Sequence, residues 1–177
     1  MLDAAGAIHE DVTLAVTGFG GHFAIVSGRG TLATERVDGP LGILVAVTGT
    51  AYSRRATEIA LALAQASGGA VTALYVEPGN ALRQWRDTFG AARGGLRPGA
   101  AVLQEAVELG RHYSVEVKTQ VKYDVDAARA LIGTLRNSSY ALLVMGVTAR
   151  SDNAIFFGAV PATVLARSSK SLLLVAT

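Results

Sequence analysis

The chain contains no cysteine and only three histidines among its 177 residues. The absence of cysteine excludes disulfide bonds, thiolate catalysis and metal sites with sulfur ligands. No charged leader with an apolar run and a small-residue cleavage site opens the chain, and no run reaches the roughly 20 apolar residues of a membrane helix. A reducing compartment agrees with these absences, and we expect a cytoplasmic location.

An excess of charge of one sign is also missing. The formal net charge is only +2, and the arginines form small groups, such as Arg54 with Arg55, rather than one basic block. We therefore expect no nucleic-acid partner. Half of the residues are apolar, which is enough to bury the core of one domain of this length.

From residue 41 onward, aliphatic runs alternate with segments of helical periodicity. A continuous run such as Ile43–Val47 is typical of a parallel strand covered on both faces. The pattern predicts a five-stranded α/β sandwich. Strands are expected at 43–47, 70–76, 115–121, 141–145 and 171–175, helices at 53–66, 100–112, 127–135 and 158–167, and a short helix followed by a loop at 79–98.

Residues 1–40 follow a different pattern from the rest. Two apolar segments, 12–16 and 22–26, flank a glycine-rich turn and predict a β-hairpin. Because an isolated hairpin is marginally stable, we expect it to join the edge of a sheet, to pack on a partner subunit or to belong to a longer polypeptide. The division expected from this pattern is an N-terminal extension at 1–40 and an α/β domain at 41–177.

The segment around the fourth expected strand is the best candidate for a ligand site. The strand ends at Met145–Gly146, and a loop leads to Gly158 and a new helix. Ligands of open parallel sheets bind beyond the carboxyl ends of the strands, and helix amino termini favour anions. A nucleotide or phosphate is therefore the first ligand to consider, and Arg150 is either a bidentate phosphate partner or a solvated loop residue.

Other chemistry-bearing residues have simpler explanations. The histidines lack metal-ligand spacing, and helix capping explains Asp124 and Asp126 better than acid–base catalysis. No nucleophile, base and orienting group can be assembled around the loop, so we expect that the protein is not an enzyme. The segment Ile155–Phe157 is either a docking patch or a loop packed on the sheet, and Ser151–Asn153 fits turn chemistry better than a metal-bridged phosphate.

The order of elements, the run Ile43–Thr50 and the helix after Arg54–Arg55 resemble the universal stress protein family over residues 42–177. The resemblance implies a Rossmann-like parallel sheet, frequent dimerisation through the last strand, and a division into members that bind ATP and members that do not. The binders resemble one another in a loop of pattern G-x2-G-x9-G-[S/T]. Here Gly146 and Gly158 match the first and third glycines.

The chain departs from that pattern at several positions. Ala149 replaces the second glycine, the following spacer is one residue short, Ala159 replaces the hydroxyl residue, and Thr48 replaces an aspartate of the binders. A Cβ at Ala149 restricts close backbone approach, and Ala159 cannot donate a hydroxyl hydrogen bond. We therefore expect ATP to be disfavoured, with ATP or AMP as the cofactors to test. The candidate binding residues carried over are Thr48, Val76, Gly146, Ala149, Arg150, Gly158 and Ala159.

The segments Gly146–Asp152 and Phe156–Gly158 resemble, more narrowly, the stress-protein-like domain at the cytoplasmic C-terminus of bacterial cation/proton antiporters. This resemblance implies a regulatory, sensing or dimerising domain linked through residues 1–40 to a transmembrane antiporter domain of the inner membrane. The alternative is a free-standing universal stress protein that binds ATP or AMP.

The last expected strand also predicts an oligomer. Leu172–Val175 is entirely apolar, and such a strand at the edge of a sheet would expose an aggregation-prone ribbon. We therefore expect a homodimer that pairs through this strand.

Overall fold

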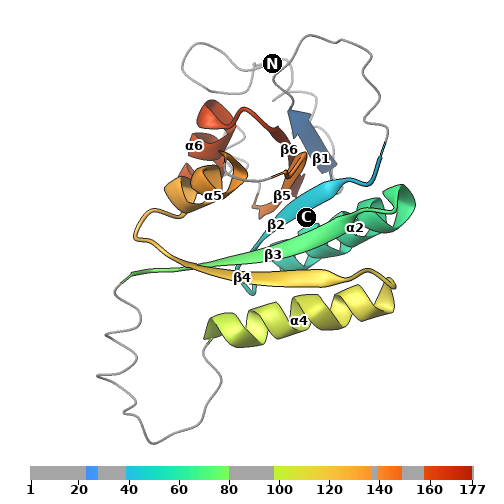
Figure 1. Ribbon diagram of the computed structural model, residues 1–177. Coiled ribbons are helices and arrows are strands. Elements are labelled where there is room, and N and C mark those ends of the chain that lie inside the picture. The colour runs from blue at the N-terminus through green and yellow to red at the C-terminus, as the bar shows by residue number, and fades with distance from the viewer. Residues whose placement is uncertain (1–22, 28–38, 80–97, 137–138, 149–157, 177) are drawn as a thin grey trace, which may run out of the picture.

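The computed structural model describes residues 23–27, 39–79, 98–136, 139–148 and 158–176 (Figure 1). Its helices and strands, in chain order, are β1 (Phe23–Ser27), β2 (Gly42–Val47), α2 (Ala51–Ser67), β3 (Ala70–Glu77), α4 (Pro98–His112), β4 (Val117–Tyr123), α5 (Ala127–Arg136), β5 (Leu142–Val147), α6 (Ala159–Arg167) and β6 (Ser171–Ala176). Each expected strand and helix within the described residues is present, with ends that differ by a few residues.

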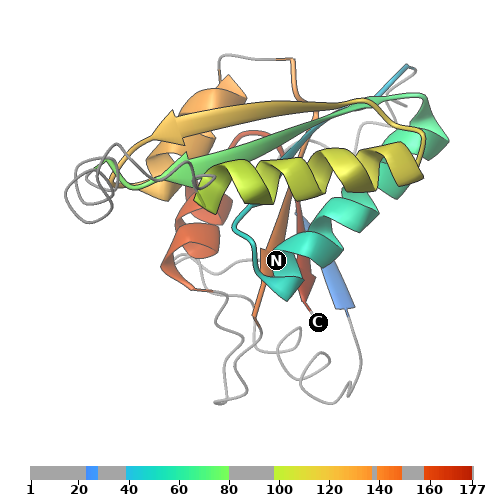
Figure 2. The same cartoon turned by 90° about the horizontal axis from the view of Figure 1, so that it is seen from below.

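The strands form one sheet in the order β1-β6-β5-β2-β3-β4. The strands β2 to β6 pair in parallel, which confirms the predicted five-stranded parallel sheet. Helices cover both faces, and Figures 1 and 2 show α4 along β3 and β4. None of the helices in the described part of the chain has both the length and the apolar character needed to span a bilayer.

Two apolar cores lie on opposite faces of the sheet because the side chains of each strand alternate between the faces. In β2, the completely buried Ile43 and Val45 contact the core under α2 and α4, whereas Leu44 contacts the core under α5 and α6. The run is apolar at every position because both faces are covered, as the sequence predicted.

The first helix of the domain, α2, begins and ends at residues that the sequence selects for these positions. The Thr50 side chain accepts a hydrogen bond from the Ser53 amide at 3.2 Å, which makes Thr50 the N-cap. At the other end, Gly68 has a φ of 64° and Gly69 N–H donates to Ala64 O at 2.8 Å. A left-handed glycine after the last turn is a common helix end, so the predicted stop at Gly68–Gly69 is confirmed.

One expected strand begins later than predicted. The sequence pattern placed its start at Val115, whereas β4 begins at Val117. The reason lies in the end of α4, because Val115 N–H donates to Gly110 O at 2.9 Å and Ser114 has a φ of 55°. Val115 thus completes the turn out of the helix and is buried there instead of joining the sheet.

The sheet has a sixth strand that extends the predicted five. The strand β1 pairs with β6 in antiparallel orientation, from Phe23 opposite Ala176 to Ser27 opposite Leu172. Addition to the sheet edge, one of the three roles considered for the apolar N-terminal segment, is confirmed for Phe23–Ser27. The first arm of the expected hairpin, 12–16, lies outside the described residues, as do residues 80–97 of the short helix and loop expected at 79–98.

This pairing corrects the premise of the predicted dimer. The homodimer through the last strand was expected because the edge of Leu172–Val175 would otherwise be unpaired, and the structure pairs that edge with β1. Both sides of β6 are therefore occupied within one chain. A second copy reaches β6 only if β1 leaves.

Candidate ligand pocket at the carboxyl ends of the strands

A cavity of about 320 Å³ lies where β2, β3 and β5 end and where α2, α5 and α6 begin. This is the edge at which open parallel sheets bind ligands. The residues that line it are Ala46, Val47, Thr48, Thr50, Tyr52, Leu74, Val76, Ala127, Leu131, Met145, Gly146, Val147, Thr148, Val160 and Pro161.

The turn from β2 to α2 is held together by its own hydroxyl groups. Thr48 N–H donates to Ser53 Oγ at 2.9 Å, and the Thr48 and Thr50 hydroxyls lie 3.1 Å apart. Gly49 supplies the left-handed residue of the turn with a φ of 78°. Ser53 is only 4% exposed, so its hydroxyl lies inside the turn and fixes the backbone at the pocket rim.

Gly146 lies at the closest approach between β5 and α2. A Cβ at this position would stand 2.2 Å from the backbone oxygen of Tyr52 and 2.6 Å from the backbone nitrogen of Ser53. Backbone atoms at such distances cannot move aside cheaply, so only glycine fits. The glycine assigned to a phosphate loop therefore also has a packing role, because it seats the first turn of α2 against the sheet.

The helix α6 begins without a side-chain cap. Gly158 is its N-cap with a φ of 93° and, as a glycine, has no side chain that could bond to the first amides. Pro161, the third residue of the helix, has no N–H, and the first helical hydrogen bond runs from Ala162 N–H to Gly158 O at 3.2 Å. By helix geometry, the amides of Ala159 and Val160 lack intrahelical partners. Of these two residues, Val160 lines the pocket.

The helix α5 begins at the same pocket but is capped by carboxylates. Asp126 Oδ1 accepts from Arg129 N–H at 3.1 Å, and Asp124 Oδ1 accepts from Asp126 N–H at 2.9 Å. The capping role expected for these aspartates is confirmed. Arg129 also binds Asp124 through its side chain, and that hydrogen bond, with help from the Asp126 amide, holds the pKa of the Asp124 carboxyl below its usual value.

Comparison with known proteins agrees with this geometry. Residues 42–176 match the universal stress protein family. The chain belongs to the universal stress protein family. None of the curated proteins matches its sequence.

Several solved universal stress proteins share the fold. One from Archaeoglobus fulgidus is 18% identical, with a TM-score of 0.60, over 76% of this chain and 93% of that chain. The Archaeoglobus protein described in complex with dAMP is 18% identical, with a TM-score of 0.58, over 76% of this chain and 97% of that chain. A universal stress protein described in complex with cAMP is 22% identical, with a TM-score of 0.56, over 78% of this chain and 98% of that chain.

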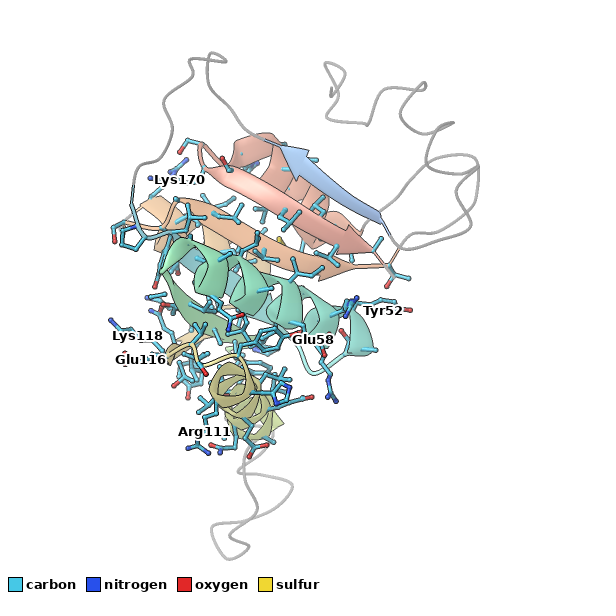
Figure 3. The ribbon with its side chains drawn as sticks, turned by 90° about the vertical axis from the view of Figure 1, so that its right-hand side faces the viewer. Tyr52, Glu58, Arg111, Glu116, Lys118 and Lys170 are labelled. Atoms are coloured by element: carbon cyan, nitrogen blue, oxygen red, sulfur yellow. The ribbon has the colours of Figure 1, made fainter. Side chains whose placement is uncertain are left out.

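The pocket of this universal stress protein domain is mainly apolar. Its lining includes the polar side chains of Thr48, Thr50, Tyr52 and Thr148, and no charged side chain among the described residues contributes to it. Figure 3 shows Tyr52 at one end of α2, with Lys118 and Lys170 on the far side of the molecule.

The structure brings together part of the residue set taken from the family pattern. Thr48, Val76 and Gly146 line the pocket, and Gly158 is the N-cap of α6 beside it. Ala159 lies in the first turn of α6 with an exposed side chain and is not part of the lining. Ala149, Arg150 and the other candidates at 151–157 lie outside the described residues.

Sequence reasoning missed several residues that shape the pocket. Tyr52, Leu131, Met145, Val160 and Pro161 all line it. Met145 and Leu131 have apolar patterns that indicate core positions, because a residue that faces the core and one that faces a cavity beside it look alike in sequence. Tyr52 had a usable signal, since it follows the turn 48–50 directly and must lie in the first turn of the helix.

A second, polar groove separates α2 from α4, with a volume of about 570 Å³. Its arginine is already paired, with Arg54 lying 3.5 Å from Glu58 and 3.4 Å from Glu105. His112 also lines this groove and packs edge-on against Tyr113, with ring centroids 5.9 Å apart. In the part of the chain that the structure describes, no group of three metal-ligating side chains comes together.

Proposed function

We propose that this domain is a sensor that binds an adenine nucleotide of low charge, such as AMP or a cyclic nucleotide, in the pocket at the carboxyl ends of the strands. One observation carries the proposal. The pocket offers an apolar chamber with a few hydroxyl groups, lies beside the first turn of α6 through Val160, and receives no charged side chain from the described residues. Similar structures described with dAMP and cAMP support an adenine ligand of this kind.

The electrostatics of the pocket disfavour a triphosphate. Each additional phosphate charge that enters an apolar site loses hydration and needs a cation or several hydrogen-bond donors in return. A helix amino terminus contributes only about 0.3–1 kcal/mol to an anion near it. The missing amide of Pro161 reduces the available donors further. A single phosphate, or the monoanionic phosphate of a cyclic nucleotide, matches this small number of hydrogen-bond donors better than ATP does.

Binding without catalysis fits the same set of residues. Acid–base or nucleophilic chemistry would need a titratable side chain within hydrogen-bond reach of the ligand. Among the described residues, the lining has one titratable side chain, that of Tyr52, with no histidine, lysine or carboxylate in the lining to act with it, and the carboxylates at the start of α5 are engaged in capping. We therefore propose a sensor and not an enzyme.

Isothermal titration calorimetry of the full chain with adenosine, AMP, cAMP and ATP, with and without Mg²⁺, tests this function. We expect AMP or cAMP to bind more tightly than ATP. The variant Thr148→Trp should abolish binding, because Thr148 is exposed at the pocket and the indole would fill it. Thr119→Trp is the matched control, since Thr119 is an exposed threonine on β4 outside the pocket lining, and it should bind as the parent does.

Two results would contradict the proposal. If ATP bound at least as tightly as AMP in the absence of Mg²⁺, the low-charge ligand class would be wrong. If none of the four ligands bound, the sensor function itself would be wrong, and the pocket would be a feature of the fold alone.

The finer form of this proposal concerns what the sensor controls. The resemblance of the segments 146–152 and 156–158 to the C-terminal domains of cation/proton antiporters supports a regulatory domain of such a transporter, and a free-standing sensor is the alternative. The reading frame upstream of the codon for Met1 distinguishes them. An uninterrupted frame that encodes a long hydrophobic transporter favours the first, and an in-frame stop codon before Met1 favours the second.

A further inference from the structure

Two threonine hydroxyl groups lie side by side at the rim of the pocket. Thr48 and Thr50 both line the cavity and are exposed, and their Oγ1 atoms lie 3.1 Å apart, so that one hydroxyl donates a hydrogen bond to the other. Thr50 Oγ1 also accepts a hydrogen bond from the Ser53 amide at 3.2 Å. The described residues contribute no further hydrogen bond to these two oxygens. Part of their hydrogen-bonding capacity is therefore left for a ligand.

The capacity that remains on the two hydroxyls can be worked out from their chemistry. A hydroxyl group has one proton and two lone pairs. The bond between the threonines uses one proton and one lone pair, and the Ser53 amide uses a second lone pair. Whichever threonine donates to the other, one proton and two lone pairs remain on the pair. It can therefore donate one hydrogen bond to a ligand and accept two.

The turn that carries these hydroxyls is held in place by contacts with its own helix and with α4. Thr48 N–H donates to Ser53 Oγ at 2.9 Å, and Ser53 is buried. Gly49 has a φ of 78°, and a Cβ there would stand 2.8 Å from Cγ2 of Val102 on α4. Because the backbone of the turn is fixed in this way, the two hydroxyls lose little freedom when they bind a ligand.

Among the parts of a nucleotide, the diol of the ribose matches the capacity of the two threonines. Two neighbouring sugar hydroxyls can donate to the two free lone pairs, and one of the sugar oxygens can accept the free proton. A phosphate could use only the single donor, and its anionic oxygens would face the unused lone pairs. The base has a separate place, because Leu74, Leu131 and Met145 line the same pocket and are buried, whereas the two threonines are exposed.

We infer that the hydroxyl pair of Thr48 and Thr50 recognises the diol of a ribose, so that the ligand of this pocket is a ribonucleotide with free 2′ and 3′ hydroxyl groups. This inference rests on the proposed function and narrows it. AMP carries such a diol, whereas the 3′ oxygen of cAMP is bonded to phosphorus and has no proton to donate. The pocket should therefore prefer AMP to cAMP.

Calorimetry of the full chain with AMP, 2′,3′-dideoxy-AMP and cAMP tests this inference. The dideoxy compound keeps the base and the phosphate and lacks only the diol. We expect the parent to bind AMP roughly tenfold more tightly than the dideoxy compound, because each neutral hydrogen bond changes an affinity several-fold, and also more tightly than cAMP.

A substitution at Thr48 locates the contact. Thr48→Val keeps the shape of the side chain and removes one hydroxyl, and it leaves the N-cap of α2 in place because the N-cap is Thr50. It should reduce the affinity for AMP about fivefold more than the affinity for the dideoxy compound. Thr119→Val is the matched control, since Thr119 is an exposed threonine on β4 outside the pocket lining, and it should change neither affinity.

The possible results separate this inference from the proposed function. Equal affinities of the parent for AMP and the dideoxy compound, or tighter binding of cAMP than of AMP, would overturn the diol contact and leave the adenine sensor intact. An equal loss of both affinities in Thr48→Val would also overturn it and assign the hydroxyls to the base or the phosphate. If none of the three compounds bound, the sensor function would be wrong, and the diol contact with it. The comparison in the parent decides even if the valine variant does not fold.

Discussion

The helices α2 and α6 begin at the same pocket but complete their first turns in different ways. The start of α2 is closed by its own side chains, with Thr50 bonded to the Ser53 amide and Ser53 bonded to the Thr48 amide. The start of α6 has Gly158 as its N-cap, with no side-chain hydrogen bond. Side chains of the chain itself therefore cap the first turn of α2, whereas the N-cap residue of α6 has no side chain to do so.

The start of α5 follows the pattern of α2, with Asp126 as its cap. Capped helix ends fix the pocket wall, and we propose that the start of α6 takes part in ligand recognition. This division gives separate expectations, because changes at α2 and α5 should alter stability, whereas changes at α6 should alter ligand affinity.

The largest effect is expected where α2 rests on the sheet. Gly146→Ala places a Cβ against the backbone of Tyr52, at 2.2 Å from its oxygen, and should lower the free energy of unfolding by about 3 kcal/mol. Urea denaturation followed by circular dichroism measures this. Gly133→Ala is the matched control, since a Cβ at Gly133 meets nothing within 4 Å in the middle of α5, and it should stabilise by about 0.5–1 kcal/mol. Equal effects of the two substitutions would contradict the packing role of Gly146.

The cap of α2 should have the next largest effect. Thr50→Ala removes the acceptor for the Ser53 amide and should lower the free energy of unfolding by about 1 kcal/mol. Thr50→Ser keeps the hydroxyl and should retain most of the stability, as measured by the same denaturation curves. A serine variant as unstable as the alanine variant would mean that the methyl group, and not the cap, matters.

A smaller effect, on binding, is expected at α6. Pro161→Ala restores an N–H to the first turn and should raise the affinity for AMP about threefold, which corresponds to roughly 0.6 kcal/mol for one additional partial charge near a phosphate. Calorimetry with adenosine provides the control, because a ligand without phosphate should gain nothing. An equal gain for adenosine would show that the change acts through pocket shape.

The smallest effect concerns the charges at α5. The folded-state pKa of Asp124 lies below its ordinary value of 3.8, so the ionised carboxylate stabilises the fold above about pH 3.8 and this contribution is lost as the pH falls through the folded pKa. The difference in Tm between the parent and Asp124→Asn should therefore shrink below pH 3.8. Arg129→Gln should remove the same pH dependence, because Arg129 is the main cause of the shift. A difference that stays constant with pH would contradict this assignment.

The strands and helices could be predicted because each of them has a characteristic sequence pattern of its own. The aliphatic run of β2, the glycines after α2 and the aspartates before α5 all act over a few neighbouring residues. The sequence pattern placed Val115 in a strand because the alternation of apolar and polar residues in β4 extends back to it. In the structure, the Val115 amide instead donates a hydrogen bond to Gly110 O at the end of α4. Such boundaries depend on a competition between two elements that local patterns do not resolve.

The candidate site was predictable only in part. The places of Thr48 and Gly146 beside a pocket follow from the order of elements and from the family pattern. The contributions of Leu131 and Pro161 do not, because these residues belong to helices whose distance from β2 is set by packing. The second role of Gly146 also required coordinates, since the atom that excludes a Cβ belongs to Tyr52, on a different element.

The sequence alone determined the class of fold and the covered sheet, because these depend on residue type and short spacing, and the family resemblance adds the prediction that triphosphate binding is disfavoured. Only the tertiary structure decided that β1 pairs with β6, that three helix starts meet at one pocket, and that one of them is uncapped. The reason is physical, since strand pairing and cavity shape arise between segments far apart in the chain, where many pairings satisfy the same local pattern and only the packed whole selects one.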